Sequence, residues 1–98
     1  MNLLITGGCG FIGSNFINFI FKFKNELNIN KIVNLDAMYY CASKDYIDSN
    51  IQNDNDYIFV KGNTIDQDLV TYILQTHQIT HIINFAAQSH VCNSFSNP

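Results

Sequence analysis

The sequence predicts an α/β protein in which a parallel sheet of four short strands is covered by helices on both faces. Four apolar runs have the length of strands, and they occupy residues 2–6, 31–35, 57–61 and 80–86. Two longer segments have apolar residues at helical spacing, and they occupy residues 11–23 and 66–77. The strand-like runs are continuously apolar rather than alternating, which is typical of parallel strands covered on both faces. Strands that alternate with helices indicate right-handed βαβ units.

The first half of the chain contains a strand, a helix and a second strand. The run over residues 2–6 ends at a cluster of glycines, as a buried strand commonly does. Over residues 11–23 the apolar side chains recur at steps of three and four, the spacing of one helix face. The strand over residues 31–35 is closed by Asp36. Residues 37–56 are polar and rich in Asn and Asp, so we expect a loop there with one short helical piece.

The second half repeats the pattern. The strand over residues 57–61 is broken by Gly62. Residues 66–77 are predicted to be helical, with their apolar side chains on one face. Residues 80–86 form the fourth strand, and we expect residues 88–98 to be irregular.

Size and composition exclude several classes of protein. With 98 residues the chain allows one domain at most, so residues 1–98 are treated as a single unit. The net charge of −3 and the five basic residues argue against binding to nucleic acid or to an anionic membrane surface. No apolar run reaches transmembrane length, and no signal peptide is evident. The three cysteines are odd in number and form no CxxC pair, which indicates reduced thiols and an intracellular, cytoplasmic protein.

Three glycines in the stretch TGGCGFIGS predict a dinucleotide-binding loop. They lie between a predicted strand and a predicted helix, which is the context that this fingerprint requires. Gly7 allows the tight turn, Gly10 lets a phosphate approach the backbone, and Gly13 lets the helix pack closely against the sheet. The start of the helix offers free N–H groups and its positive dipole end to a pyrophosphate. A purely structural turn is the alternative, and a nucleoside-triphosphate loop is excluded because no Lys follows the glycines.

Asp36 predicts which dinucleotide is bound. It ends the second strand, where a carboxylate accepts hydrogen bonds from the hydroxyls of the adenosine ribose. The same charge repels a 2′-phosphate. The sequence therefore favours NAD over NADP.

Three stretches resemble one family. TGGCGFIGSN is similar to the TGGxGFIGS signature of extended short-chain dehydrogenases/reductases, which include nucleotide-sugar epimerases and dehydratases. NFAAQSHVCNSF resembles the AAxSHVDxSF segment of dTDP-glucose 4,6-dehydratases and their UDP-sugar relatives, and LDAMYYCAS resembles the LDxLTYAGN segment. The resemblance covers essentially the whole chain. It implies the N-terminal part of a Rossmann-type NAD-binding domain, with strand order 3-2-1-4.

The resemblance also implies roles for individual residues. The pyrophosphate would lie on residues of the glycine loop and the helix start, namely Gly7, Gly10, Phe11, Ile12 and Gly13, and Asp36 would hold the adenosine ribose. The adenine edge would contact Asn63 and Thr64, where the family usually has Asp and Ile. Asn63 keeps a carbonyl acceptor but lacks the charge, so we expect weaker adenine binding. The ribose and phosphate on the nicotinamide side would lie beside Phe85, Ala86 and Ala87.

The last segment contains one departure from the family. The resemblance would place Ser89 and His90 near the sugar end of the cleft. Cys92 stands where the family has Asp, so we expect different hydrogen bonding after the fourth strand.

The chain contains a Tyr-x-x-x-Lys sequence that we do not expect to be catalytic. The family uses such a pair as its acid/base, and Tyr40 and Lys44 have the right spacing to share a helix face. They follow the second strand, however, beside the expected adenosine position, whereas the family's pair lies further along the chain. His77 and His81 are also four apart, but one ends a helix and the other begins a strand, so we expect no metal site.

These observations favour a truncated nucleotide-sugar 4,6-dehydratase-like protein that keeps an NAD half-site and binds NAD weakly. We expect no catalytic residues in the chain and no turnover by it alone. Two alternatives stay open: a non-enzymatic module that binds itself or a partner, and a piece cut from a full-length dehydratase. We also expect a homodimer through the edge of the fourth strand and the tail over residues 87–98, because an edge strand rich in β-formers and free of charge invites pairing.

Overall fold

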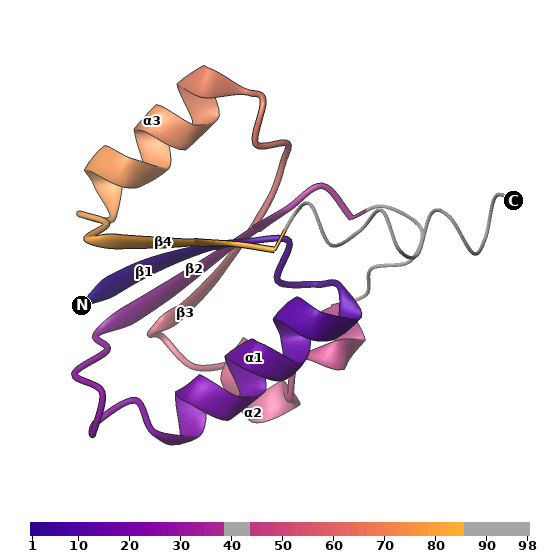
Figure 1. Cartoon of the computed structure of the whole chain (residues 1–98), viewed down its shortest axis with the longest axis vertical. Helices are drawn as coiled ribbons and strands as arrows, with labels where there is room; N and C mark the ends of the chain where they lie inside the picture. Colours follow the sequence, from indigo (N-terminus) through magenta and orange to yellow (C-terminus); the bar gives the residue numbers. More distant parts are fainter. Residues whose placement is uncertain (39–43, 86–98) are drawn as a thin grey trace, which may run out of the picture.

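The computed structural model describes residues 1–38 and 44–85, and in them the predicted sheet and helices are present (Figure 1). In chain order the elements are β1 (Asn2–Thr6), α1 (Phe11–Lys22), β2 (Lys31–Asp36), the 3₁₀ helix η1 (Lys44–Tyr46), α2 (Ser49–Gln52), β3 (Tyr57–Lys61), α3 (Gln67–Thr76) and β4 (His81–Asn84). The strands are parallel and follow the order β3-β2-β1-β4, which confirms the predicted topology.

Helices cover both faces of the sheet, as the sequence predicts. In Figure 1, α1 and α2 lie on one face and α3 lies on the other. Residues of β1 alternate between these two layers: Leu3 and Ile5 join the core that contains Ile17 of α1, whereas Leu4 joins the core that contains Ile73 of α3. Both faces of the central strand are therefore buried in apolar side chains, which explains its unbroken apolar sequence.

The two longer helices end where their sequences predict, to within one residue. At the start of α3, the side chain of Asp66 accepts a hydrogen bond of 3.1 Å from the backbone N–H of Leu69. Asp66 is thus the N-cap rather than a helical residue. Lys22 is the last residue of α1, and Phe23 is its C-cap. Past α3, Gln78 has a φ of 51°, so the chain leaves the helix through the left-handed region.

The fourth strand is shorter than predicted, and the loop before β3 has more structure than predicted. β4 ends at Asn84, although the next backbone N–H, of Phe85, still donates to the carbonyl of Thr6 at 2.7 Å. Ala86 lies outside the described residues. The segment before β3 contains both η1 and α2 where one short helical piece was expected.

No helix within residues 1–38 and 44–85 has the length and apolar character needed to cross a bilayer.

Candidate dinucleotide-binding site

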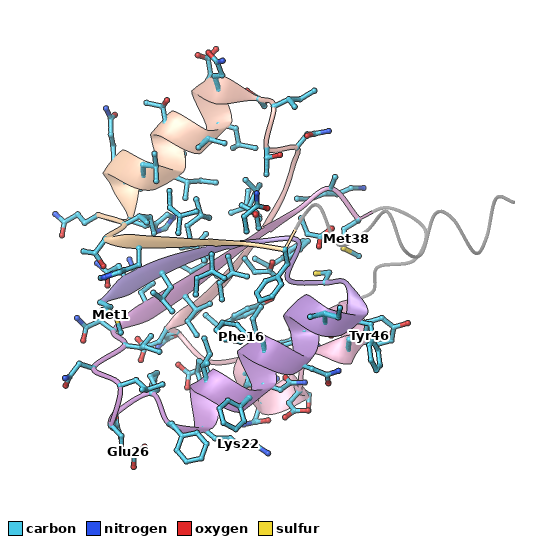
Figure 2. The ribbon with its side chains drawn as sticks, in the orientation of Figure 1. Met1, Phe16, Lys22, Glu26, Met38 and Tyr46 are labelled. Carbon is cyan, nitrogen blue, oxygen red and sulfur yellow. The ribbon has the colours of Figure 1, made fainter. Side chains whose placement is uncertain are left out.

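The segments predicted to bind a cofactor all follow the carboxyl ends of parallel strands. These ends share one edge of the sheet, and the strand order reverses between β1 and β4, which is where ligands bind in open α/β sheets. Met38 and Tyr46 lie at this edge in Figure 2, whereas Met1 lies at the opposite edge. The fold therefore gathers the described candidate residues at the position expected for a dinucleotide.

The loop between β1 and α1 turns sharply at its first glycine. Gly7 has a φ of 77°, in the left-handed region that favours glycine, and its N–H donates to the carbonyl of Leu35 at 2.9 Å. This is the tight turn that the sequence predicts at Gly7.

Gly13 allows a close contact between the start of α1 and the end of β1. A Cβ at Gly13 would collide with the carbonyl oxygen of Gly7 and would lie 2.9 Å from the Cα of Gly8. The first turn of α1 thus lies directly against the loop that follows β1, while Ile17 further along the helix packs with Leu3 and Ile5 of the sheet. Gly10 is different, since the nearest atom to a Cβ there would be the carbonyl oxygen of Gly7 at 3.5 Å. Nothing in the described residues requires glycine at position 10 on steric grounds, which leaves close approach of a ligand as its predicted role.

The start of α1 is open to solvent. Its N-cap is Gly10, which has no side chain to bond the first-turn N–H groups. Phe11 and Ile12 are 71% and 51% exposed, although both are apolar. The ring of Phe11 meets that of Tyr46 edge to face, with centroids 6.4 Å apart. An anion placed here would find unsatisfied N–H groups and the positive end of the helix dipole.

Asp36 lies beside the glycine loop and is almost completely buried. Its Oδ2 accepts a hydrogen bond of 2.8 Å from the backbone N–H of Cys9, and its Oδ1 accepts one of 2.7 Å from that of Met38. A carboxylate oxygen can accept more than one hydrogen bond, so both oxygens can also accept from ribose hydroxyls. The predicted ribose ligand is therefore also the residue that holds the loop against β2.

Asn34 and Gly8 are important residues that the sequence reasoning missed. The carboxamide of Asn34 is fully buried and accepts a hydrogen bond of 3.0 Å from the N–H of Gly8. A Cβ at Gly8 would collide with that same oxygen. The signal was present, because one Asn interrupts the apolar run KIVNLD and a buried polar side chain needs a partner.

After β3, the predicted adenine contacts lie in a tight turn. The side-chain oxygen of Asn63 accepts a hydrogen bond from the N–H of Ile65 at 3.1 Å. The backbone carbonyl of Asn63 accepts one from the N–H of Asp66 at 3.0 Å. Thr64 is exposed. The side-chain oxygen that was expected to accept from adenine thus already accepts a hydrogen bond from the chain's own backbone.

After β4, the side chain of Phe85 contacts α1. It is partly buried and its ring lies 5.2 Å, centroid to centroid, from that of Phe16, which Figure 2 shows between α1 and the sheet. The other predicted residues of this segment lie outside the described residues: Ala86, Ala87, Ser89, His90 and Cys92.

The remaining candidates do not converge on this site. Tyr40 lies outside the described residues, and Lys44 begins η1. His77 has its Nδ1 3.3 Å from the ammonium of Lys31, and its pKa is lowered by burial and by that charge. The Nδ1 of His81 is instead 2.8 Å from the hydroxyl of Thr80.

Comparison with known proteins identifies the family. Residues 4–98 match the model of the GDP-mannose 4,6 dehydratase family. The chain belongs to this family. The family resemblance of the glycine loop and of the AAQSHVCNSF segment is confirmed, since the relatives of the chain include dTDP-glucose 4,6-dehydratases.

Two relatives of the chain are several times longer than the chain itself. The chain is 42% identical over 95 residues to a dTDP-glucose 4,6-dehydratase of Xanthomonas campestris. This alignment covers 97% of this chain and 25% of that protein. The chain is 43% identical over 96 residues to a trifunctional UDP-glucose 4,6-dehydratase of Arabidopsis thaliana, covering 98% of this chain and 14% of that protein. The chain spans a quarter or less of the length of these relatives, in their N-terminal region.

A solved dehydratase structure has the same fold. The crystal structure of dTDP-glucose 4,6-dehydratase from Bacillus anthracis, in complex with NAD, superposes with a TM-score of 0.79 at 37% identity. The match covers 88% of this chain and 26% of that one. The described residues thus have the fold of an NAD-binding dehydratase domain.

Proposed function

We propose that this chain forms the part of a nucleotide-sugar 4,6-dehydratase that holds the adenosine and pyrophosphate of NAD. One observation carries the proposal: Asp36 is bonded to the N–H of Cys9, so the predicted ribose ligand and the glycine loop form one unit beside the uncapped start of α1. Ribose and pyrophosphate are adjacent groups in NAD. A single molecule can therefore contact both features.

The position of Asp36 favours NAD over NADP. Its carboxylate lies at the carboxyl end of β2, where the ribose 2′-hydroxyl would be bound, and its only described partners are two backbone N–H groups. No Lys is bonded to it within residues 1–38 and 45–85, so its charge would repel a 2′-phosphate.

The affinity for NAD is expected to be weak in the 98-residue protein. The chain supplies residues for the adenosine end, while the relatives that it matches are four or more times longer. Each contact that is made elsewhere in those proteins and is missing here costs about 1 kcal/mol, and 1.4 kcal/mol is tenfold in affinity.

We further propose that the 98-residue protein has no dehydratase turnover. Dehydration needs hydride transfer, an acid/base pair and bound sugar. The resemblance implies a catalytic Tyr-x-x-x-Lys on a later helix, whereas Tyr40 and Lys44 follow β2 in the sequence. The relatives are named for dTDP-glucose and UDP-glucose, so either nucleotide sugar is a candidate substrate of the larger enzyme.

Calorimetric titration tests the proposal. NAD and NADP are titrated into the wild-type chain and into Asp36→Asn, and the chain with excess NAD is assayed for a 4-keto-6-deoxy product from dTDP-glucose and UDP-glucose. We expect weak binding of NAD, weaker binding of NADP and no product. Tighter binding of NADP than of NAD would contradict the role of Asp36, and a product abolished by Tyr40→Phe would show that this pair is catalytic.

A second candidate function is self-association, and the edge of the sheet favours it. In the described residues β4 has a strand on one side only, and its Ile82 is 57% exposed. An apolar hollow of about 300 Å³ lies between β4 and α1, lined in part by Ile83, Leu3 and Phe16. The proposed occupant is a second copy of the chain, because two equal edges can pair about a twofold axis. Burying about 400 Å² of apolar surface would contribute roughly 10 kcal/mol per partner before association costs.

A further inference from the structure

The side chain of Asn34 connects the glycine loop to the interior of the sheet. Its Oδ1 accepts from the N–H of Gly8 at 3.0 Å, and its Nδ2 donates to the phenol oxygen of Tyr57 at 3.0 Å. Nδ2 also lies 3.4 Å from the sulfur of Cys9. A backbone N–H can only donate, so the carboxamide oxygen must face Gly8 and the NH₂ group must face Tyr57.

This network is closed to solvent and tightly packed. Asn34 and Cys9 are fully buried, and Tyr57 is 8% exposed. A Cβ at Gly8 would collide with the oxygen of Asn34 and would lie 2.6 Å from the Cδ1 of Ile17. The peptide of Gly8 therefore lies directly on the carboxamide, and the loop has little freedom to move away from β2 without breaking a buried hydrogen bond.

Three consecutive loop N–H groups are directed at β2. Gly7 donates to the carbonyl of Leu35 at 2.9 Å, Gly8 to the side chain of Asn34, and Cys9 to that of Asp36. None of these three groups is directed outward to a ligand. The donors offered to an anion therefore begin at the first turn of α1, whose position depends on how the loop is held.

We propose that Asn34, supported by Tyr57, is a positioning residue for the pyrophosphate of the dinucleotide. It acts through Gly8: by fixing that peptide, it sets the path from Gly7 to the start of α1, where the phosphate would bind. This role rests on the proposed function, but the hydrogen bonds that carry it do not. Asn34 itself is fully buried behind the loop, so it would not touch the dinucleotide.

The first test is amide hydrogen exchange at Gly8 in Asn34→Ala. The variant removes the acceptor, so we expect the Gly8 amide to exchange about tenfold faster relative to the mid-strand amide of Ile5. Ile73→Ala is the matched control, because it opens a cavity in the core under α3 and leaves the loop contacts in place. In this control the ratio of the two rates should stay unchanged. An equal rise of the ratio in both variants, or no rise in Asn34→Ala, would overturn the proposal.

A milder variant keeps the test valid if Asn34→Ala does not fold. Tyr57→Phe removes only the phenol oxygen that accepts from the carboxamide, and we expect the same ratio to rise about threefold. An unchanged ratio in Tyr57→Phe would remove Tyr57 from the proposal.

The second test is the affinity for NAD at a temperature where both variants are folded. Asn34→Ala should bind NAD about tenfold more weakly than the wild-type chain, and Ile73→Ala should bind it equally well. Equal affinity in Asn34→Ala, with faster exchange at Gly8, would overturn the positioning role. If the wild-type chain binds no NAD, the proposed function fails, while the exchange measurement still decides whether Asn34 holds the loop.

Discussion

The backbone N–H of Cys9 donates a hydrogen bond of 2.8 Å to Oδ2 of Asp36, which joins the glycine loop to the end of β2. A residue predicted as a ligand of ribose is therefore also part of the loop's support. Any substitution of Asp36 changes both properties, so affinity and stability have to be measured together.

Asp36→Ala should lower the free energy of unfolding by about 2–3 kcal/mol, because the buried N–H of Cys9 loses a charged acceptor and that of Met38 loses another. Asp36→Asn should lower the free energy of unfolding by less, since one side-chain oxygen remains as an acceptor. Asp36→Asn should also raise the affinity for NADP relative to NAD by about tenfold, because the repulsive charge is gone. Urea denaturation and calorimetry measure the two effects. An unchanged NADP-to-NAD ratio in Asp36→Asn would show that the carboxylate serves the loop alone.

Gly13→Ala and Gly10→Ala should separate a glycine needed for packing from one needed for a ligand. At Gly13 the new methyl group would collide with the carbonyl of Gly7, so we expect a loss of about 2–3 kcal/mol of stability and a melting temperature at least about 10 °C lower. At Gly10 the nearest atom is 3.5 Å away and φ is −72°, so stability should change by about 1 kcal/mol or less.

The same pair should differ in affinity for NAD. The methyl group of Gly10→Ala would face the expected path of the pyrophosphate, so we expect binding at least about tenfold weaker in a protein that is almost as stable as the wild type. Thermal denaturation and calorimetry on both variants provide the check. Unimpaired NAD binding by Gly10→Ala would argue that the pyrophosphate does not approach the backbone there.

The sequence was sufficient to predict the sheet. Continuous apolar runs predict buried parallel strands, and the family resemblance implies the order β3-β2-β1-β4 that the structure has. The turn at Gly7 was also predictable, because a sharp turn that needs a positive φ requires only one residue, a glycine.

Contacts that depend on strand register were not predictable. Asn34 faces the loop because Ile5 pairs with Asn34 and Thr6 with Leu35, and a shift by one residue would turn it to the other face. The contact of Gly13 with Gly7 and Gly8 is likewise not specified by the spacing of the glycines alone. Phe85 likewise contacts Phe16 of α1, which the sequence pattern does not specify.

The stability of the protein should fall between about pH 10 and pH 12 because of Tyr57. Burial raises the pKa of its phenol to about 12, against an ordinary value of 10.0. The unfolded chain therefore loses this proton first as the pH rises, and the stability present below pH 10 is lost progressively as the pH approaches the folded value. The loss should be about 2–3 kcal/mol, at 1.36 kcal/mol for each pH unit.

Tyr57→Phe isolates this effect. The pKa of Lys24 is also raised, chiefly by its hydrogen bond with Asp56, but Lys24 is the same in both proteins. Urea denaturation at several pH values should give a steeper decline for the wild type than for Tyr57→Phe. Parallel curves would mean that the phenol is not held neutral in the folded protein.

The proposed self-association predicts a dimer at micromolar concentration that Ile82→Lys disrupts. Ile82 is exposed on the edge strand β4, so an isologous pairing would bring two lysines together in an apolar interface. Phe19→Lys is the matched control, because Phe19 is 61% exposed on α1 and does not line the hollow beside β4. Sedimentation equilibrium should show a dimer for the wild type and for Phe19→Lys, and a monomer for Ile82→Lys. A monomeric wild type would refute self-association, and a dimer that persists in Ile82→Lys but not in Phe19→Lys would move the interface to the outer face of α1.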